Sequence, residues 1–322
     1  NTFSANSFGS IALGAGAAGT SIASDNSGVE GIWIVDGTIN NSATWNAPFP
    51  YIITGDSHVT SGTTLTVNPG VIVKIKPGVR FLVDGTLNAQ GTADEKIYFT
   101  SFKDDSVGDD ANSDGDATSP SAGNWTYMLL GYNSSATATL SHCVVRYGGG
   151  NWGGWGNDSL IVVNGGSNVS IDNCELAHSL SRGIRIEGAT GTTTISNSAI
   201  YDNAQYGLYF NNSTGNVTIN GCQIFNSLSG QINVNNSPNV TITATPAEML
   251  NASAAPGTVA GSTKVTATVG SGNHLVVQIS SSTISNVDLH SLVPTGAGII
   301  DPYTEGDRKS TRLNSSHITS SY

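Results

Sequence analysis

A repeat of 24 residues between Leu160 and Val234 limits what this chain can fold into more than any other feature of its sequence. Apolar residues recur at this spacing in three columns, and in each column they alternate with polar residues, as in a strand with one buried face. The first column contains Leu160/Val162, Ile184/Ile186, Leu208/Phe210 and Ile232/Val234; the second contains Val169/Ile171, Thr193/Ile195, Val217/Ile219 and Val240/Ile242; the third contains Leu176, Ile200 and Ile224.

Turns rich in Asn, Ser, Thr and Gly separate these segments, and no helical pattern lies between them. Three short strands per repeat therefore predict one coil of a parallel β-helix, whose coils stack at roughly 4.8 Å. We expect Leu160, Ile184, Leu208 and Ile232 to stack in consecutive coils with their side chains inside.

The three cysteines follow the same periodicity. Cys174, Ser198 and Cys222 share one column, and Cys143 precedes Cys174 by one repeat plus a 7-residue insertion. An odd number of cysteines in a column of small residues favours stacked, buried thiols over a disulfide framework or a metal site. Cys174 and Cys222 would be roughly 9.6 Å apart, beyond the reach of a disulfide.

From Trp45 onward, short alternating strands are separated by turns such as Asn68-Pro69-Gly70 and Asp84-Gly85. Three of these segments are distinctive: Thr64–Ile75, Gly85–Ala93 and Ile97–Ser101. They resemble the opening coils of right-handed parallel β-helix domains in large bacterial secreted and surface proteins. The resemblance implies an all-β, right-handed solenoid over residues 45–245, in which these segments build and cap the coils and carry no catalysis. Residues 1–44 are expected to be the end of a preceding module or an N-terminal cap.

Two further segments follow the predicted solenoid. Residues 246–306 contain Ala255-Pro256-Gly257-Thr258 and Asp301-Pro302-Tyr303, and they resemble the first half of a β-rich repeat of Gram-positive extracellular proteins. Residues 307–322 begin with DRKSTRLNSSH, which resembles the in-frame translation of a sequencing adapter. We therefore expect a monomeric fragment of a multidomain protein.

The repeat is interrupted between Lys103 and Asn124 by a loop with six aspartates: Asp104, Asp105, Asp109, Asp110, Asp114 and Asp116. Asp110, Asn112, Asp114 and Gly115 match D-x-N-x-D-G, a spacing at which side-chain oxygens converge on Ca²⁺. The carbonyl of Asp116 would be the next ligand. The twelfth position of the EF-hand pattern is Ser121 instead of Glu, so Asp104 or Asp105 would have to complete the shell. The loop thus predicts a structural Ca²⁺ site, with a solvated acidic loop as the alternative.

A second interruption, Tyr147–Asp158, is rich in Gly and contains Trp152 and Trp155. These tryptophans are candidates for a platform on which a sugar ring stacks. Alternatively, the loop is a lid over Ile161 and Val163, which the alternation places on the outside of the solenoid.

Outward-facing positions of adjacent coils bring polar residues together in pairs. The expected pairs are His178 with Asp202, Arg182 with Tyr206, Arg185 with Tyr209, and Glu187 with Asn211. Arg185, Tyr206 and Tyr209 join the two tryptophans as candidate carbohydrate-binding residues. A lyase needs a base opposite a Ca²⁺ held by several carboxylates, and an inverting hydrolase needs a close group of aspartates. Neither constellation is evident, and a single Arg–Glu pair is more often a surface ion pair than a catalytic site.

The composition narrows the class of function. A formal net charge of −11 at pH 7, with only 12 Lys and Arg, argues against nucleic acid as a partner. The sequence contains no run of 18 apolar residues, which is about the length that would predict a membrane-spanning helix. The sequence favours a non-catalytic extracellular scaffold or carbohydrate-adhesion module of a bacterial surface protein, with a polysaccharide or cell-wall glycan as the candidate partner. The alternative is a polysaccharide lyase or glycoside hydrolase that acts on an extracellular polysaccharide.

Overall fold

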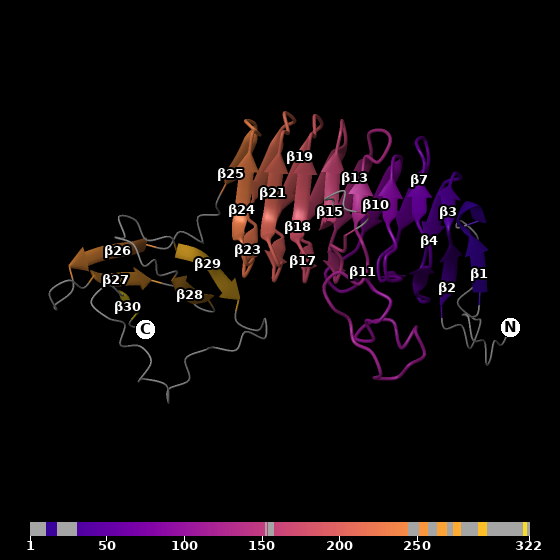
Figure 1. The fold of residues 1–322 in the computed structure, drawn as a ribbon, viewed down its shortest axis with the longest axis horizontal. Coiled ribbons are helices and arrows are strands. Elements are labelled where there is room, and N and C mark those ends of the chain that lie inside the picture. Colours follow the sequence, from indigo (N-terminus) through magenta and orange to yellow (C-terminus); the bar gives the residue numbers. More distant parts are fainter. Residues whose placement is uncertain are drawn as a thin grey trace. The chain divides into compact units, whose positions relative to one another are not determined.

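A computed structural model describes residues 11–17, 31–151, 153 and 158–243, and the backbone of five strands after residue 250. The chain divides into two units, residues 1–243 and residues 244–322. The first unit is a stack of coils, each made of three short strands, which Figure 1 shows side by side along the chain.

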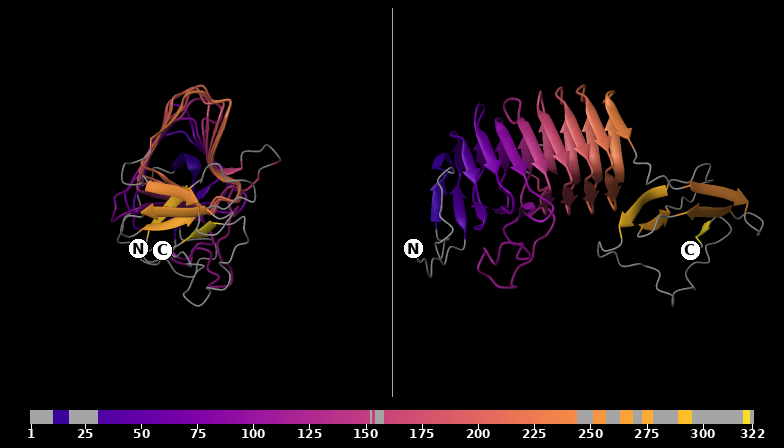
Figure 2. Two further views of the ribbon diagram at one scale, coloured as in Figure 1. Left: turned by 90° about the vertical axis from the view of Figure 1, so that its left-hand side faces the viewer. Right: turned by 180° about the vertical axis from the view of Figure 1, so that it is seen from behind.

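The strands of successive coils form three parallel sheets, which run along the stack (Figure 2). Sheet I contains β1 (Ile11–Gly14), β2 (Ile32–Val35), β5 (Tyr51–Ile53), β8 (Ile72–Ile75), β11 (Ile97–Ser101), β14 (Cys143–Arg146), β17 (Glu175–Ala177), β20 (Ala199–Tyr201) and β23 (Gln223–Phe225). Sheet II contains β3 (Gly37–Ile39), β6 (Ser57–Val59), β9 (Phe81–Val83), β12 (Met128–Leu130), β15 (Ser159–Asn164), β18 (Arg182–Glu187), β21 (Tyr206–Asn211) and β24 (Gly230–Asn235). Sheet III contains β4 (Ala43–Trp45), β7 (Thr64–Val67), β10 (Thr86–Gln90), β13 (Thr137–Ser141), β16 (Asn168–Asp172), β19 (Thr193–Ser196), β22 (Val217–Asn220) and β25 (Val240–Thr243).

The predicted fold class is confirmed: the unit is a right-handed parallel β-helix without α-helices among its described residues. Its stack begins earlier than Trp45, because β1 to β4 already extend the three sheets. A 3₁₀ turn, η1 (Ala15–Ala17), follows β1. Residues 1–44, expected to be a preceding module or a cap, therefore contribute coils where they are described.

The register confirms most of the predicted columns. Ile184, Leu208 and Ile232 pair in consecutive coils, and so do Leu176, Ile200 and Ile224. The pairing of the first member is wrong by one residue, because Ile161, and not Leu160, pairs with Ile184; the Leu160 side chain is nevertheless buried in the core, as predicted. The reason lies in the sequence Leu-Ile-Val-Val at 160–163: four consecutive apolar residues carry no alternation, so the pattern cannot show which of them face inward.

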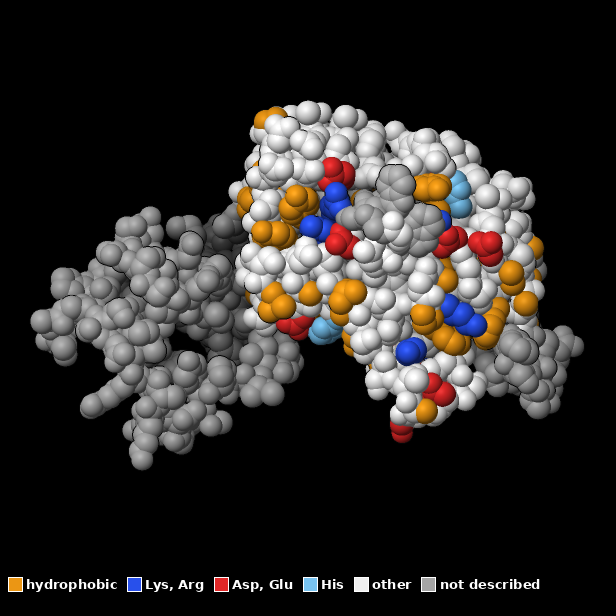
Figure 3. Space-filling view, in the orientation of Figure 1, with side chains coloured by type: hydrophobic (Ala, Val, Ile, Leu, Met, Phe, Trp, Pro, Cys, Tyr) orange, Lys and Arg blue, Asp and Glu red, His pale blue; other side chains and the backbone are white. Residues whose placement is uncertain are grey.

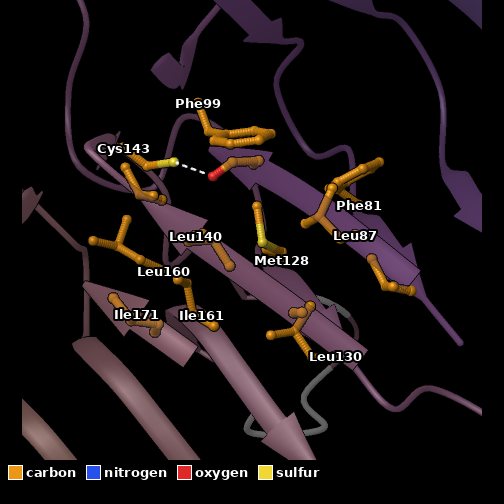
Figure 4. Close-up of a cluster of buried hydrophobic side chains, with 14 of the residues drawn as sticks. Phe81, Leu87, Phe99, Met128, Leu130, Leu140, Cys143, Leu160, Ile161 and Ile171 are labelled. Carbon is orange, nitrogen blue, oxygen red and sulfur yellow. Dashed lines mark hydrogen bonds between the residues drawn. The ribbon is translucent and has the colours of Figure 1, made fainter. Parts of the chain in front are cut away.

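The interior is a continuous apolar core lined by all three sheets. Figure 4 shows one section of it, where Phe81, Phe99, Met128, Leu140 and Ile161 point toward one another. The rings of Phe81 and Phe99 stack with centroids 6.2 Å apart. In the later coils similar inward side chains stack on one another, as Ile195 does on Ile219, whereas the earlier coils stack residues of different size, such as Trp45 on Val67.

The corners between sheets are built alike in successive coils. At the corner from sheet III to sheet I, residues with positive φ such as Asn173 and Asn197 turn the chain. The residue that follows each of them caps a backbone N–H of the preceding coil: the Cys143 N–H donates to Cys174 Sγ (3.4 Å), and the Cys174 N–H donates to Ser198 Oγ (3.0 Å). None of the three cysteines forms a disulfide, as predicted; Cys143 and Cys174 are buried, whereas Cys222 is only partly buried.

The second unit is described only by its backbone strands. β26 (Asn251–Pro256) pairs antiparallel with β27 (Thr263–Thr268), which pairs parallel with β30 (Ile318–Ser320). β28 (Asn273–Val277) pairs antiparallel with β29 (Leu289–Pro294). Within the described part of the chain, no helix is long and apolar enough to cross a membrane.

Candidate functional site

The acidic loop, residues 103–124, connects β11 of sheet I with β12 of sheet II, and Figure 1 shows it extending away from the coils. Lys74 on β8 is fully buried beneath it. Its Nζ donates to the carbonyl of Asp109 and lies 3.8 Å from Asp105 Oδ1. Burial lowers the pKa of the Lys74 ammonium, although the nearby aspartates, Asp105 first among them, act in the opposite direction.

Arg146 on β14 is the second basic anchor of this loop. Its guanidinium lies 2.7 Å from Asp104 Oδ2, and the Asp104 side chain is only 1 % exposed. Burial by itself would raise the pKa of Asp104. Hydrogen bonds from Ser106 and Thr100 and the charge of Arg146 outweigh burial, so that the pKa lies below its ordinary value. Asp104 therefore forms a buried ion pair with Arg146, and this pair holds the start of the loop on sheet I.

Three other carboxylates of the loop converge. Asp105, Asp110 and Asp114 each place an oxygen within 4.8 Å of the others. The Asp110 carboxylate accepts hydrogen bonds from the backbone N–H groups of Asp114 (3.2 Å) and Gly115 (2.7 Å), which fixes its orientation. Burial and the proximity of Asp110 and Asp114 raise the pKa of Asp105 against the effect of Lys74.

Two oxygens at this cluster are buried and have no hydrogen-bond partner: Asp105 Oδ1 and Asn112 Oδ1. A hard cation such as Ca²⁺ prefers carboxylate and amide oxygens of this kind, so Asp105, Asp110, Asn112 and Asp114 fit a cation. Of the two carboxylates expected to complete the shell, Asp105 lies in the cluster and Asp104 is held by Arg146. The Asp116 side chain is exposed, and it is not a member of the cluster.

The second candidate region is the outer surface of sheet II, where the predicted pairing of Arg185 with Tyr209 is confirmed. Arg182 and Arg185 both lie over the ring of Tyr209, at 4.6 and 5.9 Å from its centroid. The rings of Tyr206 and Tyr209 are 5.8 Å apart. We call Arg182, Arg185, Tyr206 and Tyr209 the Arg–Tyr cluster.

Two carboxylates hold the arginines of this cluster in place. Arg182 forms an ion pair with Asp158, and Arg185 lies 3.7 Å from Asp158 and 2.8 Å from Glu187. The sequence pattern places Asp158 only at the end of a loop that interrupts the repeat, although its partner Arg182 lies 24 residues, one repeat, further along the chain. Figure 3 shows basic, acidic and hydrophobic side chains side by side on the visible surface of the solenoid. Trp152 and Trp155 lie outside the described residues.

A separate apolar cluster lies on the outside of the same sheet. It contains Leu82, Tyr127, Leu129 and Val162, none more than 4 % exposed. An apolar outer surface was expected at Ile161 and Val163, but these two side chains belong to the inner core and Val162 faces outward. The one-residue register difference accounts for this correction as well.

Comparison with known families agrees with this architecture. The sequence of residues 129–299 matches the family described as a right-handed β-helix region, which is more than half of the chain. The protein therefore belongs to the right-handed β-helix family. The matched segment continues past Thr243, where β25, the last strand of the three-sheet stack, ends. No curated protein and no solved structure was found to match this chain significantly.

Proposed function

We propose that this protein is a non-catalytic extracellular scaffold that binds a polysaccharide through the Arg–Tyr cluster. The family alone is compatible with an adhesion scaffold or with a polysaccharide-cleaving enzyme. The observation that carries the proposal is the arrangement of two arginines and two tyrosines on adjacent coils of one rigid sheet.

The chemistry of the cluster suits a sugar chain. Aromatic rings offer apolar surface to the C–H face of a pyranose ring, and guanidinium N–H groups donate to hydroxyl or carboxylate oxygens. The ion pairs with Asp158 and Glu187 fix both guanidinium groups before a ligand arrives, which reduces the conformational entropy lost on binding.

We propose a structural role for a Ca²⁺ ion at Asp105, Asp110, Asn112 and Asp114. A bound cation would offset the mutual repulsion of the carboxylates and contact the two buried oxygens that accept no hydrogen bond. The chain itself supplies part of the same neutralisation through Lys74, which holds Asp105 and Asp109 of this acidic loop next to sheet I.

One observation favours the enzymatic alternative. Asp158 and Glu187 both contact Arg185, so two carboxylates flank a single guanidinium on the outer surface of sheet II. Glycoside hydrolases act with two carboxylates on opposite sides of the scissile bond. In this protein each carboxylate is an ion-pair partner, and we therefore assign both to positioning the arginines.

Binding and turnover can be measured on the same samples. Titration calorimetry with cellohexaose, chitohexaose and hexagalacturonate should show binding of at least one probe, and a reducing-end assay should show no increase over time. Tyr209→Ala should weaken binding about tenfold, since it removes the ring that both arginines cover. Tyr132→Ala is the matched control, because Tyr132 lies under Arg80 at a different place on the solenoid. New reducing ends would establish the enzymatic alternative, and no binding of any probe would refute the adhesion role.

A further inference from the structure

A groove of about 480 Å³ lies at the corner where the chain passes from sheet I to sheet II. We call it the corner groove. One wall is the end of the acidic loop, with Pro120 and Ala122, and the other includes Leu228, whose side chain is 85 % exposed. The volume falls within the range of about 300–1,000 Å³ that is typical of small-ligand sites.

Tyr147, His178, Asp202 and Asn226 form a row along this groove. They occupy the same position in four consecutive coils, as the register of the preceding strands shows. All four have positive φ, between 52° and 65°, so their side chains leave the corner in the same direction. The row therefore repeats at the coil spacing of roughly 4.8 Å.

The row combines a flat apolar surface with hydrogen-bonding groups. The rings of Tyr147 and His178 stack at 5.2 Å with an interplanar angle of 9°. His178 Nδ1 lies 3.9 Å from Asp202 Oδ2, and the two side chains are 39 % and 40 % exposed. A ligand in the groove would thus meet an imidazole, a carboxylate and an amide in succession, with Leu228 beside them.

The charge of the groove distinguishes it from the Arg–Tyr cluster. Its described lining residues include Asp202 and no Lys or Arg. An acidic sugar would meet the Asp202 carboxylate without a compensating cation, which disfavours its binding. Sugar hydroxyls, in contrast, can donate to Asp202 and exchange hydrogen bonds with His178 and Asn226.

We propose that the corner groove binds neutral sugar units of an extended glycan. A chain of repeating units suits a row of polar side chains with a regular spacing, and the C–H face of each ring suits Leu228 and Pro120. The residues after this corner enter β18, β21 and β24, so the groove adjoins the sheet that bears the Arg–Tyr cluster. The inference rests on the proposed function and adds to it a second contact and a preference for uncharged units.

The test uses calorimetry of the full chain with cellohexaose, chitohexaose and hexagalacturonate. His178→Asn removes the imidazole, and Asn tolerates the positive φ. Leu228→Ser removes an exposed apolar wall. Each substitution should weaken binding of the neutral hexasaccharide at least fivefold. The matched controls are His142→Asn, at a residue of the same backbone conformation on another corner, and Val35→Ser, at another exposed apolar residue; both should bind as the wild type does.

The outcomes separate the two proposals. Binding of a neutral probe that His178→Asn and Leu228→Ser leave unchanged would overturn the groove assignment and leave the Arg–Tyr cluster, reported by Tyr209→Ala, intact. Binding of hexagalacturonate alone would overturn the preference for neutral sugars and with it the groove assignment. A wild-type protein that binds none of the three probes would overturn both proposals.

Discussion

The Asp104 carboxylate depends on Arg146 for its countercharge, because only 1 % of the Asp104 side chain reaches solvent. Arg146→Met keeps much of the aliphatic packing of the arginine but leaves this charge unpaired. Removing one partner of a buried ion pair costs about 3–5 kcal/mol, and since Arg146 is partly exposed we expect about 3 kcal/mol. Urea denaturation measures the difference. The double variant Asp104→Asn/Arg146→Met should recover part of the loss; a double variant as unstable as Arg146→Met would contradict the explanation.

The same pair predicts a pH dependence. The pKa of Asp104 is lower in the folded protein than its ordinary value of about 3.9. Its contribution to stability is therefore complete above about pH 4 and is lost as the pH falls through the lowered folded-state value. The difference in free energy of unfolding between wild type and Asp104→Asn should shrink below pH 4. A difference that stays constant down to pH 2 would show that Asp104 does not titrate with folding.

At the scale of residues, the sequence predicts side chains whose neighbours lie one repeat away. Arg185 and Tyr209 are such a pair, and so are Cys174 and Ser198. The contact between Lys74 and Asp105 could not be predicted, because Asp105 lies in an irregular loop and no repeat spacing relates the two positions. The ion pair between Arg146 and Asp104 could not be predicted for the same reason. It depends on the conformation of the loop, and the sequence spacing does not give that conformation.

The acidic loop is the element whose order depends most on charge. If Ca²⁺ binds at Asp105, Asp110, Asn112 and Asp114, it stabilises the folded state by mass action, and a chelator should lower the melting temperature. Differential scanning calorimetry with and without chelator measures the change. Asp114→Ala should abolish the Ca²⁺ dependence. Asp116→Ala is the matched control, because that side chain is exposed and lies outside the cluster, and it should retain the dependence. A wild-type melting temperature indifferent to Ca²⁺ would leave Lys74 and Arg146 as the anchors of the loop.

At the scale of elements, the strands could be predicted wherever polar and apolar residues alternate. The strands of sheet III show this most clearly, with inward Val169 and Ile171 separated by Ser170. β15 could be predicted as a strand but not oriented, because all of Leu160 to Val163 are apolar. Its outward Val162 packs with Leu82 and Leu129, so both faces of β15 are buried. A strand buried on both faces has no alternation of polar and apolar residues, and that alternation is what shows which side chains face inward.

The whole solenoid is close to one-dimensional, since each strand hydrogen-bonds only to the strands of the coils before and after it. The two proposed binding surfaces share this regularity, because the Arg–Tyr cluster and the row of side chains in the corner groove each come from successive coils. The spacing of the side chains within each row is set by the hydrogen-bonded ladder between coils. A long, repetitive partner can therefore meet the same spacing along several coils without the protein having to rearrange.

One-dimensional packing also predicts how the molecule loses structure. Ile184 and Ile232 belong to the same inward column, but Ile184 is fully buried in the middle of the stack, whereas Ile232 is only partly buried in the last coil of sheet II. Ile184→Ala should cost about 3 kcal/mol and Ile232→Ala about 1 kcal/mol, because the cavity left at the end is open to relaxation and solvent. Hydrogen exchange read by mass spectrometry should show faster exchange in β15, β18 and β21 for the first variant, and in β24 and β25 alone for the second. Equal acceleration throughout the stack in both variants would mean that the coils unfold as a single cooperative unit and that nearest-neighbour packing does not limit the transition.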